Sequence, residues 1–169
     1  MNIFRILKIG IMTIRVRRYK YNEDDMIACS RLTRNTYKAF CFDYENKEAS
    51  IRYMDMYDTD KDIDFTRKIM NMSKIFFVAC DGGQIVGLVR GGIDRIRGLY
   101  VDKDRQGEGI GRKLVEVFEK EVMKHGAKVI KIRASLYSVN FYKKRGYKKS
   151  TGLRLMGGSI VQPMKKVIG

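Results

Sequence analysis

The fold is decided by one stretch of the sequence, Leu99-Tyr100-Val101-Asp102-Lys103-Asp104-Arg105-Gln106-Gly107-Glu108-Gly109-Ile110-Gly111-Arg112. It predicts a strand, a short loop with alternate glycines, and then a helix. Glycines let the backbone approach a ligand closely and adopt unusual dihedral angles. The free N–H groups of a helix's first turn, together with the helix dipole, favour an anion at that position. The stretch therefore predicts an anion-binding loop that suits a pyrophosphate.

Two well-known loops of this kind do not match the residues. A P-loop closes with Gly-Lys-Ser or Gly-Lys-Thr, whereas Gly111 is followed here by Arg112 and Lys113. A dinucleotide-binding fingerprint has the spacing GxGxxG and an acidic residue about 20 positions later. The spacing here is GxGxG, and the later region holds Lys131 and Arg133. Both alternatives therefore lack residues that they require.

Around this stretch the pattern predicts one α/β (α+β) domain over residues 13–169, preceded by an N-terminal extension, residues 1–12. We expect a mixed, mostly antiparallel sheet of about six to seven strands with helices on both sides. The expected strands are Thr13–Arg18, Ile75–Cys80, Ile85–Arg90, Ile93–Val101, Val129–Arg133, and two more after Tyr147 that form a hairpin near Gly157-Gly158.

Helix boundaries are predicted from capping residues. Asn22 is expected to cap the first helix and Asp60 a later one, with a loop and short helix in the mixed segment between them. Leu114, Phe118 and Val122 recur every four residues in the helix after the glycine loop, which we expect Gly126 to end. A short helix is expected over Tyr137–Arg145, and Gly91-Gly92 is expected to break the chain between two strands.

Composition argues against a membrane-spanning or metal-binding protein but does not identify a function. The chain of 169 residues is 44% hydrophobic and 32% charged, as expected of a globular domain, and no apolar run is long enough to cross a bilayer. Lys and Arg number 35 against 19 Asp and Glu, a net charge of +16 that attracts polyanions. With three widely spaced cysteines and a single histidine, His125, no metal site is expected, and reduced thiols favour a cytoplasmic location.

Two motifs carry a resemblance to a known family. Gln106-x-x-Gly109-x-Gly111 resembles the pyrophosphate loop of the GNAT superfamily of N-acetyltransferases. Asn140-Phe141-Tyr142-Lys143-Lys144-Arg145-Gly146-Tyr147 resembles its second signature, a tyrosine five residues before an aromatic residue that follows glycine. Either motif alone is weak evidence, but both occur in the family's order and separation. The resemblance implies the GNAT fold and acetyl-CoA as cosubstrate.

The resemblance also implies roles for particular residues. The backbone of Leu99, Tyr100 and Val101 would pair with the pantetheine arm as an added strand. Tyr142 would protonate the departing thiolate, and Asn140 would hydrogen-bond the pantetheine. One of Lys143, Lys144 and Arg145 would meet the adenosine phosphates. The pyrophosphate would be held by Gln106, Gly107, Glu108, Gly109, Ile110, Gly111 and Arg112.

The sequence departs from the family where an acceptor amine would be deprotonated. Arg95 stands near the position where some members carry a glutamate, and strand alternation points Asp94 to the other face. Asp43 and Glu45 fall in the variable region that usually builds the substrate wall. Ser135 and Ser138 replace an asparagine and an alanine that are common in the family. A general base is therefore not assigned, and a chain of water molecules is an alternative.

The acceptor class stays open at this point. Protein N-termini, lysine side chains and small amines are all compatible with the resemblance, and Asp55, Asp58, Asp60, Asp62 and Asp64 form a candidate acidic patch for a cationic acceptor. Two other functions are alternatives. One is a CoA-binding module without catalysis, which the missing base favours. The other is an RNA-associated basic protein, favoured by net charge alone. A homodimer is compatible with the family.

Overall fold

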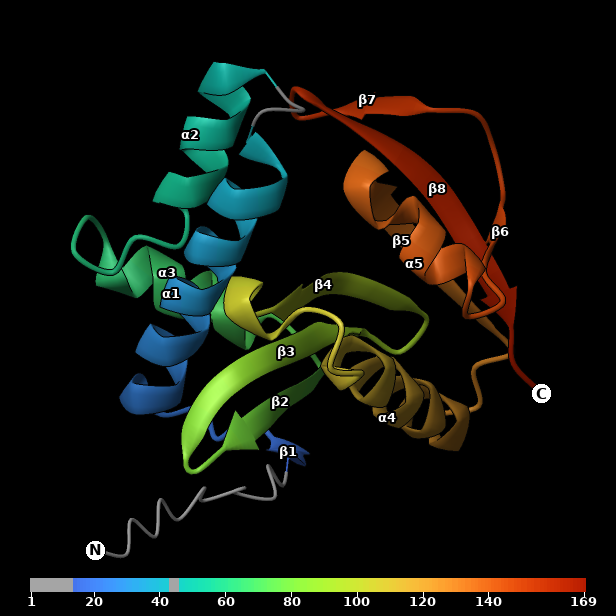
Figure 1. The fold of residues 1–169 in the computed structure, drawn as a ribbon, viewed down its shortest axis with the longest axis horizontal. Helices are drawn as coiled ribbons and strands as arrows, with labels where there is room; N and C mark the ends of the chain where they lie inside the picture. Colours follow the sequence, from blue (N-terminus) through green and yellow to red (C-terminus); the bar gives the residue numbers. More distant parts are fainter. Residues whose placement is uncertain (1–13, 43–45) are drawn as a thin grey trace, which may run out of the picture.

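One mixed sheet runs through the computed structural model, which describes residues 14–42 and 46–169 (Figure 1). The strand order is β1-β2-β3-β4-β5-β8-β6, and β7 also pairs with β8. Every pairing is antiparallel except β4 with β5, which is parallel. The strands are β1 (Arg15–Arg18), β2 (Ile75–Asp81), β3 (Gln84–Gly92), β4 (Arg95–Val101), β5 (Val129–Ser135), β6 (Lys148–Lys149), β7 (Arg154–Met156) and β8 (Ser159–Val167).

This architecture confirms the predicted fold class. The described residues give eight strands, one more than the upper expectation, because β6 and β7 are only two and three residues long. The N-terminal extension, residues 1–12, and the predicted wall residues Asp43 and Glu45 lie outside the described residues. The helices are α1 (Glu23–Phe40), α2 (Lys47–Asp55), α3 (Ile63–Asn71), α4 (Ile110–Lys124) and α5 (Val139–Lys143).

The capping predictions hold at α1 and fail at α3. The side chain of Asn22 accepts a hydrogen bond from the backbone N–H of Asp25, and three acidic residues follow where the helix dipole favours them. At α3 the cap is Asp62 instead of Asp60, because Asp62 accepts from the Phe65 N–H. The Asp60 N–H donates to Asp58, so Asp60 belongs to the turn before the helix.

Gly91-Gly92 does not break the chain as predicted. Both glycines continue β3, and the turn falls at Ile93 and Asp94. A Cβ atom on Gly91 would lie 2.0 Å from the Arg95 carbonyl oxygen, so glycine is needed there for a close backbone approach. The predicted short helix over Tyr137–Arg145 is also divided, into a 3₁₀ turn (Leu136–Ser138) and α5.

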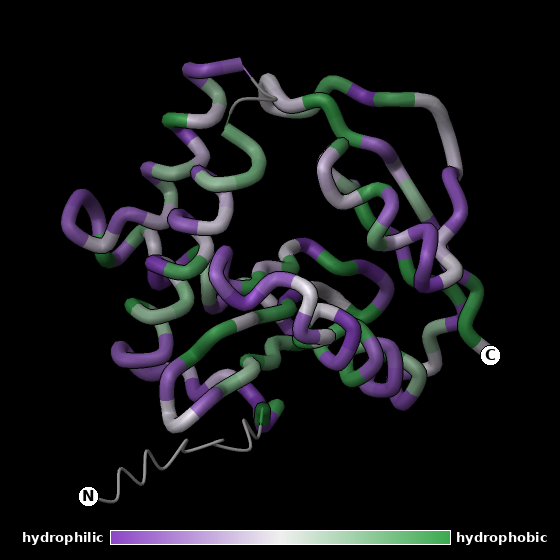
Figure 2. Tube along the Cα trace, viewed as in Figure 1, coloured by the Kyte–Doolittle hydropathy of each residue, from purple (hydrophilic) through white to green (hydrophobic). Residues whose placement is uncertain are grey.

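Two hydrophobic cores lie on opposite faces of the sheet. On one face α4 packs on β2, β3 and β4, and α5 packs on β5. On the other face α1 packs on β3 and β4 together with α2 and α3. Figure 2 shows the matching pattern, with hydrophobic and hydrophilic residues alternating around α1 and α4. The α4-side core draws residues from both halves of the sheet, whereas the α1-side core draws none of its buried members from β5 to β8.

The sheet opens between its two parallel strands. β4 and β5 pair at a single register position, Arg95 with Lys131. Beyond it the strands diverge, so the second half of β4 pairs with β3 alone (Figure 1). The register between β3 and β4 also shifts here, since Arg90 pairs with Gly98 and Gly91 with Ile96. Arg97 is therefore an extra residue on β4, a β-bulge beside the opening.

Candidate active site

The glycine loop has the strand–loop–helix geometry that the sequence predicts. Gly107 and Gly109 have φ of 83° and 80°, in the left-handed region that favours glycine. Gly109 occupies the N-cap position of α4 and provides no side-chain cap. The first-turn amides of a fifteen-residue helix are thus left for a ligand, and the helix dipole favours an anion there.

Three polar side chains of the loop hold the loop itself. The Gln106 amide donates to the carbonyls of Val101 (2.7 Å) and Asp102 (3.3 Å), which ties the loop to the end of β4. Arg105 pairs with Glu108 (2.8 Å) and reaches Asp81 (3.0 Å). The side chains of Gln106 and Glu108 therefore position the loop, and Arg105 neutralises the carboxylate of Glu108 beside the cradle.

α5 supplies further groups to the same place. A Cβ atom on Gly111 would lie 3.1 Å from the Phe141 ring, so the glycine lets α4 and α5 pack closely. The Arg145 guanidinium stacks on that ring at 3.6 Å and donates to the Phe141 carbonyl. Its buried Nε has no hydrogen-bond partner among the described residues, and burial and the nearby Arg112 lower the pKa of the guanidinium. A bound anion would accept a hydrogen bond from this Nε and would favour the charged form of the guanidinium. These residues therefore fit a phosphate group.

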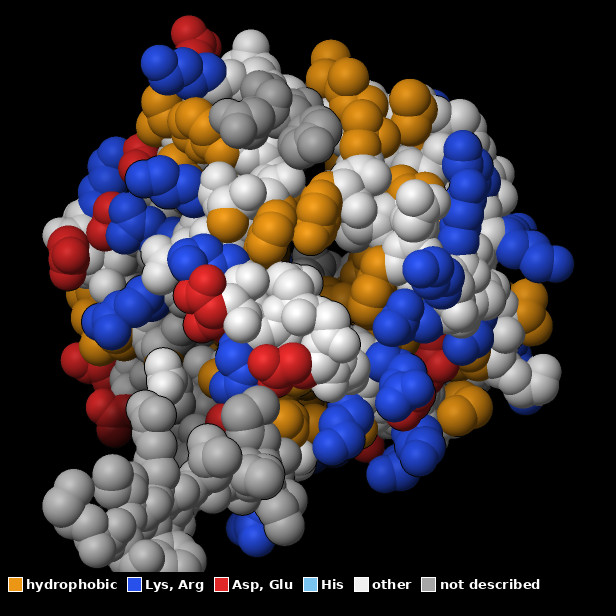
Figure 3. All heavy atoms as spheres, in the orientation of Figure 1, with side chains coloured by type: hydrophobic (Ala, Val, Ile, Leu, Met, Phe, Trp, Pro, Cys, Tyr) orange, Lys and Arg blue, Asp and Glu red, His pale blue; other side chains and the backbone are white. Residues whose placement is uncertain are grey.

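Lys and Arg side chains gather over α4 and α5 on the face shown in Figure 3, beside a hollow bordered by hydrophobic side chains. Arg112 is exposed and lies 3.8 Å from Glu116. Of the three basic residues predicted to meet adenosine phosphates, Lys143 and Lys144 are exposed, whereas Arg145 is held in place by its contacts. The structure therefore favours Arg145 for that role.

The unpaired edge of β4 provides backbone groups for an added strand. Asp102 donates its N–H to Val86 of β3, and backbone groups alternate between the two edges of a strand. Leu99 and Val101 therefore face the opening, while Tyr100 faces β3. The Val101 carbonyl already accepts from Thr36 (3.2 Å) and Gln106. Among the described residues, nothing bonds to the backbone groups that Leu99 turns toward the opening, whereas Val101 keeps only its N–H there.

Tyr142 of α5 is 2% exposed and belongs to the α4-side core, with its ring edge-on to Phe141 and Tyr147. Burial raises the pKa of its hydroxyl far above the ordinary value. No described residue hydrogen-bonds to that hydroxyl. Tyr147, by contrast, donates to Glu119 at 3.0 Å and packs in the core. Tyr142 is thus a protonated phenol with a free O–H, whereas Tyr147 is a structural residue.

Two smaller predictions concern polar groups near α5. Asn140 is exposed in the first turn of α5, where its side chain remains available. Ser135 and Ser138 bond to each other at 3.0 Å, and Ser138 also donates to the Ser135 carbonyl. The serines that replace the family's asparagine and alanine therefore stabilise the turn between β5 and α5.

The opposite side of β4 carries a group of aromatic hydroxyls that the sequence pattern did not reveal. The Tyr100 and Tyr53 hydroxyls are in direct contact, and Arg90 donates to Tyr57 and to Ser73 (3.2 Å). Burial is the largest cause of the raised pKa of Tyr53 and Tyr100. Tyr53 belongs to α2 and Tyr100 to β4, which lie far apart in sequence. Only tertiary structure brings them together.

The predicted acidic patch is largely engaged in ion pairs and caps. Asp55 pairs with Lys61, Asp58 with Arg34 at 2.7 Å, and Asp64 with Arg67. Asp62 caps α3 and Asp60 lies in the preceding turn. Asp94, the carboxylate beside the bulge, lies 3.4 Å from Lys131. These carboxylates are therefore poor candidates for binding a cationic acceptor or for accepting its proton.

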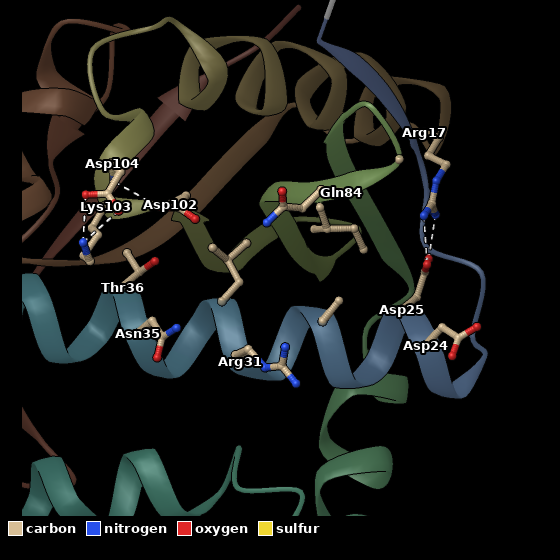
Figure 4. A pocket seen from close by; sticks show the side chains of 14 residues that line it. Arg17, Asp24, Asp25, Arg31, Asn35, Thr36, Gln84, Asp102, Lys103 and Asp104 are labelled. Atoms are coloured by element: carbon tan, nitrogen blue, oxygen red, sulfur yellow. Dashed lines mark hydrogen bonds and ion pairs between the residues drawn. The ribbon is translucent and has the colours of Figure 1, made fainter.

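A cavity of about 440 Å³ lies away from the glycine loop, between α1, the β2–β3 turn and the residues after β4 (Figure 4). Its charged side chains largely pair with one another. Asp25 binds Arg17 at 2.6 Å, and Lys103 binds Asp104 at 2.8 Å. Because none of the glycines from 107 to 111 lines it, this cavity is separate from the candidate site.

The described residues contain no group of His, Cys, Asp and Glu able to hold a metal ion. In the same part of the chain no helix is long and apolar enough to span a membrane. The candidate site is thus assembled from the glycine loop, the open edge of β4, and α5.

A family model for the acetyltransferase (GNAT) domain matches residues 43–168. The chain belongs to the GNAT acetyltransferase family. Like other members, it is therefore an acyltransferase by family, and the two motifs lie within the matched region. It is 28% identical over 110 residues to an acetyltransferase of Sodalis glossinidius (strain morsitans), covering 61% of this chain and 78% of that protein.

Solved GNAT structures share the fold. A GCN5-related N-acetyltransferase from Rhodopseudomonas palustris superimposes with a TM-score of 0.78 at 22% identity, over 94% of this chain and 98% of that one. The PaiA N-acetyltransferase from Thermoplasma acidophilum, solved in complex with coenzyme A, gives 0.71 at 20% identity, over 93% and 100%. At these identities the likeness concerns the fold.

Proposed function

We propose that this GNAT protein transfers an acetyl group from acetyl-CoA to a primary amine. One observation carries the proposal: the α4 N-terminus, with its left-handed glycines and no side-chain cap, follows directly on a strand whose outer edge is unpaired. The cradle fits a pyrophosphate and the edge fits an extended amide chain. Solved relatives of the same fold contain coenzyme A.

Each residue then has a defined task. The first-turn amides of α4, with Arg112 and Arg145, bind the phosphates. Leu99 aligns the pantetheine arm through its backbone, and the bulge at Arg97 frees backbone groups beside the thioester. Acetyl-CoA supplies the activated acyl group. Tyr142, protonated and free to donate, stabilises the departing thiolate at its sulfur.

The attacking amine must arrive in its neutral form, since a free lysine amine has a pKa of roughly 10.4. Asp94 is already in an ion pair with Lys131, and Arg95 is a cation. The mechanism therefore leaves deprotonation of the amine to bulk water or to a chain of water molecules. Direct attack on the thioester follows, and no covalent acyl-enzyme is required.

Isothermal titration with acetyl-CoA tests cosubstrate binding. Gly109→Glu places a negative charge at the α4 N-terminus and should weaken binding by about a hundredfold or more. Gly82→Glu is the matched control, because Gly82 also has a positive φ (54°) and open space around it but lies in the β2–β3 turn. Loss of binding in both variants, or in neither, would contradict the assignment of the loop.

A CoA-binding module without catalysis is the second candidate, favoured by the ion-paired state of Asp94. The two functions differ in turnover. Release of the CoA thiol in the presence of screened amines, well above the rate of hydrolysis alone, supports the enzyme. Tight binding of acetyl-CoA with no thiol release for any amine class supports the binding module.

A further inference from the structure

Like charges face one another across four strands on one face of the sheet. Register places Arg95 of β4 opposite Lys131 of β5, Lys131 opposite Lys165 of β8, and Lys165 opposite Lys148 of β6. Directly opposed residues point to the same face, so these four form one row. Neighbouring strands lie about 4.8 Å apart, which gives the row a length of roughly 14 Å. We call it the cationic row.

The row faces away from α4 and α5. Ile130, Ile132 and Met164 are buried in the α4-side core, and side chains alternate along a strand. Lys131, between the two isoleucines, and Lys165, next to Met164, therefore point to the opposite face. Arg133 is exposed on that face as well. A groove of about 550 Å³ lies here, whose charged lining residues are Arg95, Arg97, Lys131, Arg133 and Lys165.

Most of this charge is not neutralised within the described part of the protein. Asp94 lies 3.4 Å from Lys131 and 4.0 Å from Arg95. No ion pair in that part of the chain involves Arg97, Arg133 or Lys165. Like charges directly opposite each other in a sheet are destabilising. The acidic residues near α3 are paired, whereas these cations are not, which indicates an anionic ligand.

The groove adjoins the opening between β4 and β5. Arg97 is the bulged residue of β4 and lies two positions before Leu99, one of the two β4 residues that face the opening. At about 3.3 Å per residue, the groove begins within roughly 7 Å of Leu99. The bulge at Arg97, which our proposal places beside the thioester, lines the groove itself. A molecule bound in the groove therefore lies on the path of an acceptor amine.

We propose that the groove binds acidic side chains of a polypeptide acceptor and so selects a free amine that has Asp or Glu residues beside it. This inference rests on the proposed function. A polypeptide is favoured over nucleic acid because the described residues that line the groove include no aromatic side chain, and single-stranded nucleic acids bind largely by base stacking on aromatic rings. The Pro163 ring and the aliphatic stems of the lysines suit a polypeptide chain.

Fluorescence anisotropy of the full chain tests the docking step. The probe is a short Asp/Glu-rich peptide with a free N-terminus and a C-terminal fluorophore. Arg133→Glu with Lys165→Glu should weaken binding by about tenfold or more, because both cations in the groove are reversed. Lys68→Glu with Lys74→Glu is the matched control, since these residues are exposed near α3 and give the same change in net charge. The control should stay within about twofold of wild type.

Several outcomes overturn the inference. Equal losses in both double variants would mean that net charge alone attracts the peptide. Equal affinity for a Lys-rich peptide would remove the charge selectivity. Binding of an oligouridylate that depends on Arg133 and Lys165, with no binding of the acidic peptide, would make the groove a nucleic-acid site.

Turnover separates the inference from the proposed function. With the acidic peptide as acceptor, the groove variant should raise KM and leave kcat nearly unchanged, because the groove acts before the chemical step. Groove-dependent binding with no CoA thiol release would keep the docking site and refute acetyl transfer. Acetylation of other amines without binding of the acidic peptide would refute the docking site alone.

Discussion

The β1–β4 half of the sheet is covered on both faces, by α1 to α3 on one and by α4 on the other, whereas the β5–β8 half contributes buried residues only to the α4-side core. The first half has a long antiparallel ladder. The second meets it at one register position, Arg95 with Lys131. The candidate site lies at this junction, where β4 has an open edge.

This difference between the two halves explains how the fold opens a space for a ligand between β4 and β5. The shared α4-side core holds the two halves together, so the opposite faces are free to diverge. We call the β1–β4 half the framework half, because helices cover both of its faces, and the β5–β8 half the binding half, because our proposal places an acceptor on its cationic row. Substitutions in the shared core, at the site and in each half of the sheet test this difference between the halves.

Phe118→Ala tests the shared core. Phe118 is fully buried, and its ring lies 3.0 Å from the place of a Cβ on Gly91. Its loss should lower the free energy of unfolding by about 3–5 kcal/mol. Leu155→Ala on β7 is the control, since Leu155 is 75% exposed and should change stability by less than about 0.5 kcal/mol. Urea denaturation measures both, and similar losses would contradict a common core.

Tyr142→Phe and Tyr147→Phe test the boundary between site and framework. The first should lower kcat for acetyl transfer by about a hundredfold and leave stability nearly unchanged, because only a free O–H is removed. The second breaks the hydrogen bond to Glu119 and should cost about 1–2 kcal/mol of stability with kcat retained. Paired kinetics and thermal denaturation measure both quantities. An unchanged kcat in Tyr142→Phe would remove the tyrosine from the mechanism.

The framework was largely predictable from sequence because its signals are local. Period-four apolar residues located α4. The two expected strands Ile75–Cys80 and Ile85–Arg90 left the β2–β3 turn between them, where Gly82 and Gly83 have positive φ. The sequence predictions were wrong where one residue type is compatible with two local structures. Gly91 permits a close approach to Arg95 instead of ending a strand, and Asp62 caps the helix that two earlier aspartates also precede.

The binding surface was less predictable because it depends on register. Lys131 and Arg133 alternate visibly with isoleucines, yet their alignment with Lys165 and Lys148 follows from pairings of strands far apart in sequence. The contact between Tyr53 and Tyr100 has the same origin. The glycine loop was found from sequence because its chemistry is contiguous in the chain.

Asp25→Asn tests the framework half through pH. Hydrogen bonds from Arg17 hold the pKa of the Asp25 carboxyl below its usual value, and the Lys20 N–H adds to this. Since the pKa is depressed in the folded state, the stability it gives is present above the unfolded value of about 3.9 and is lost as pH falls through the folded value.

Asp25→Asn should therefore cost about 1–3 kcal/mol at roughly pH 7, with the difference from wild type shrinking below about pH 4. Denaturant titrations at the two pH values measure it. Glu48→Gln serves as control because its pair with Arg52 is 3.9 Å long and exposed. A cost independent of pH would mean that packing, not charge, accounts for the role of Asp25.

Lys165→Gln tests the binding half and has the smallest expected effect. Lys165 lies directly between Lys131 and Lys148, so removing its charge relieves repulsion on both sides. We expect unfolding free energy to rise by about 0.2–1 kcal/mol at low salt. The gain should shrink in about 1 M NaCl, where the screening length falls to about 3 Å. Lys68→Gln, at an exposed position of α3, should show no such gain. A loss of stability, or a gain insensitive to salt, would mean that the row is not strained and would remove the argument that its charges are retained for a ligand. A salt-sensitive gain would show that charge repulsion along the row lowers the stability of the β5–β8 half, as expected of charges that are retained for a ligand.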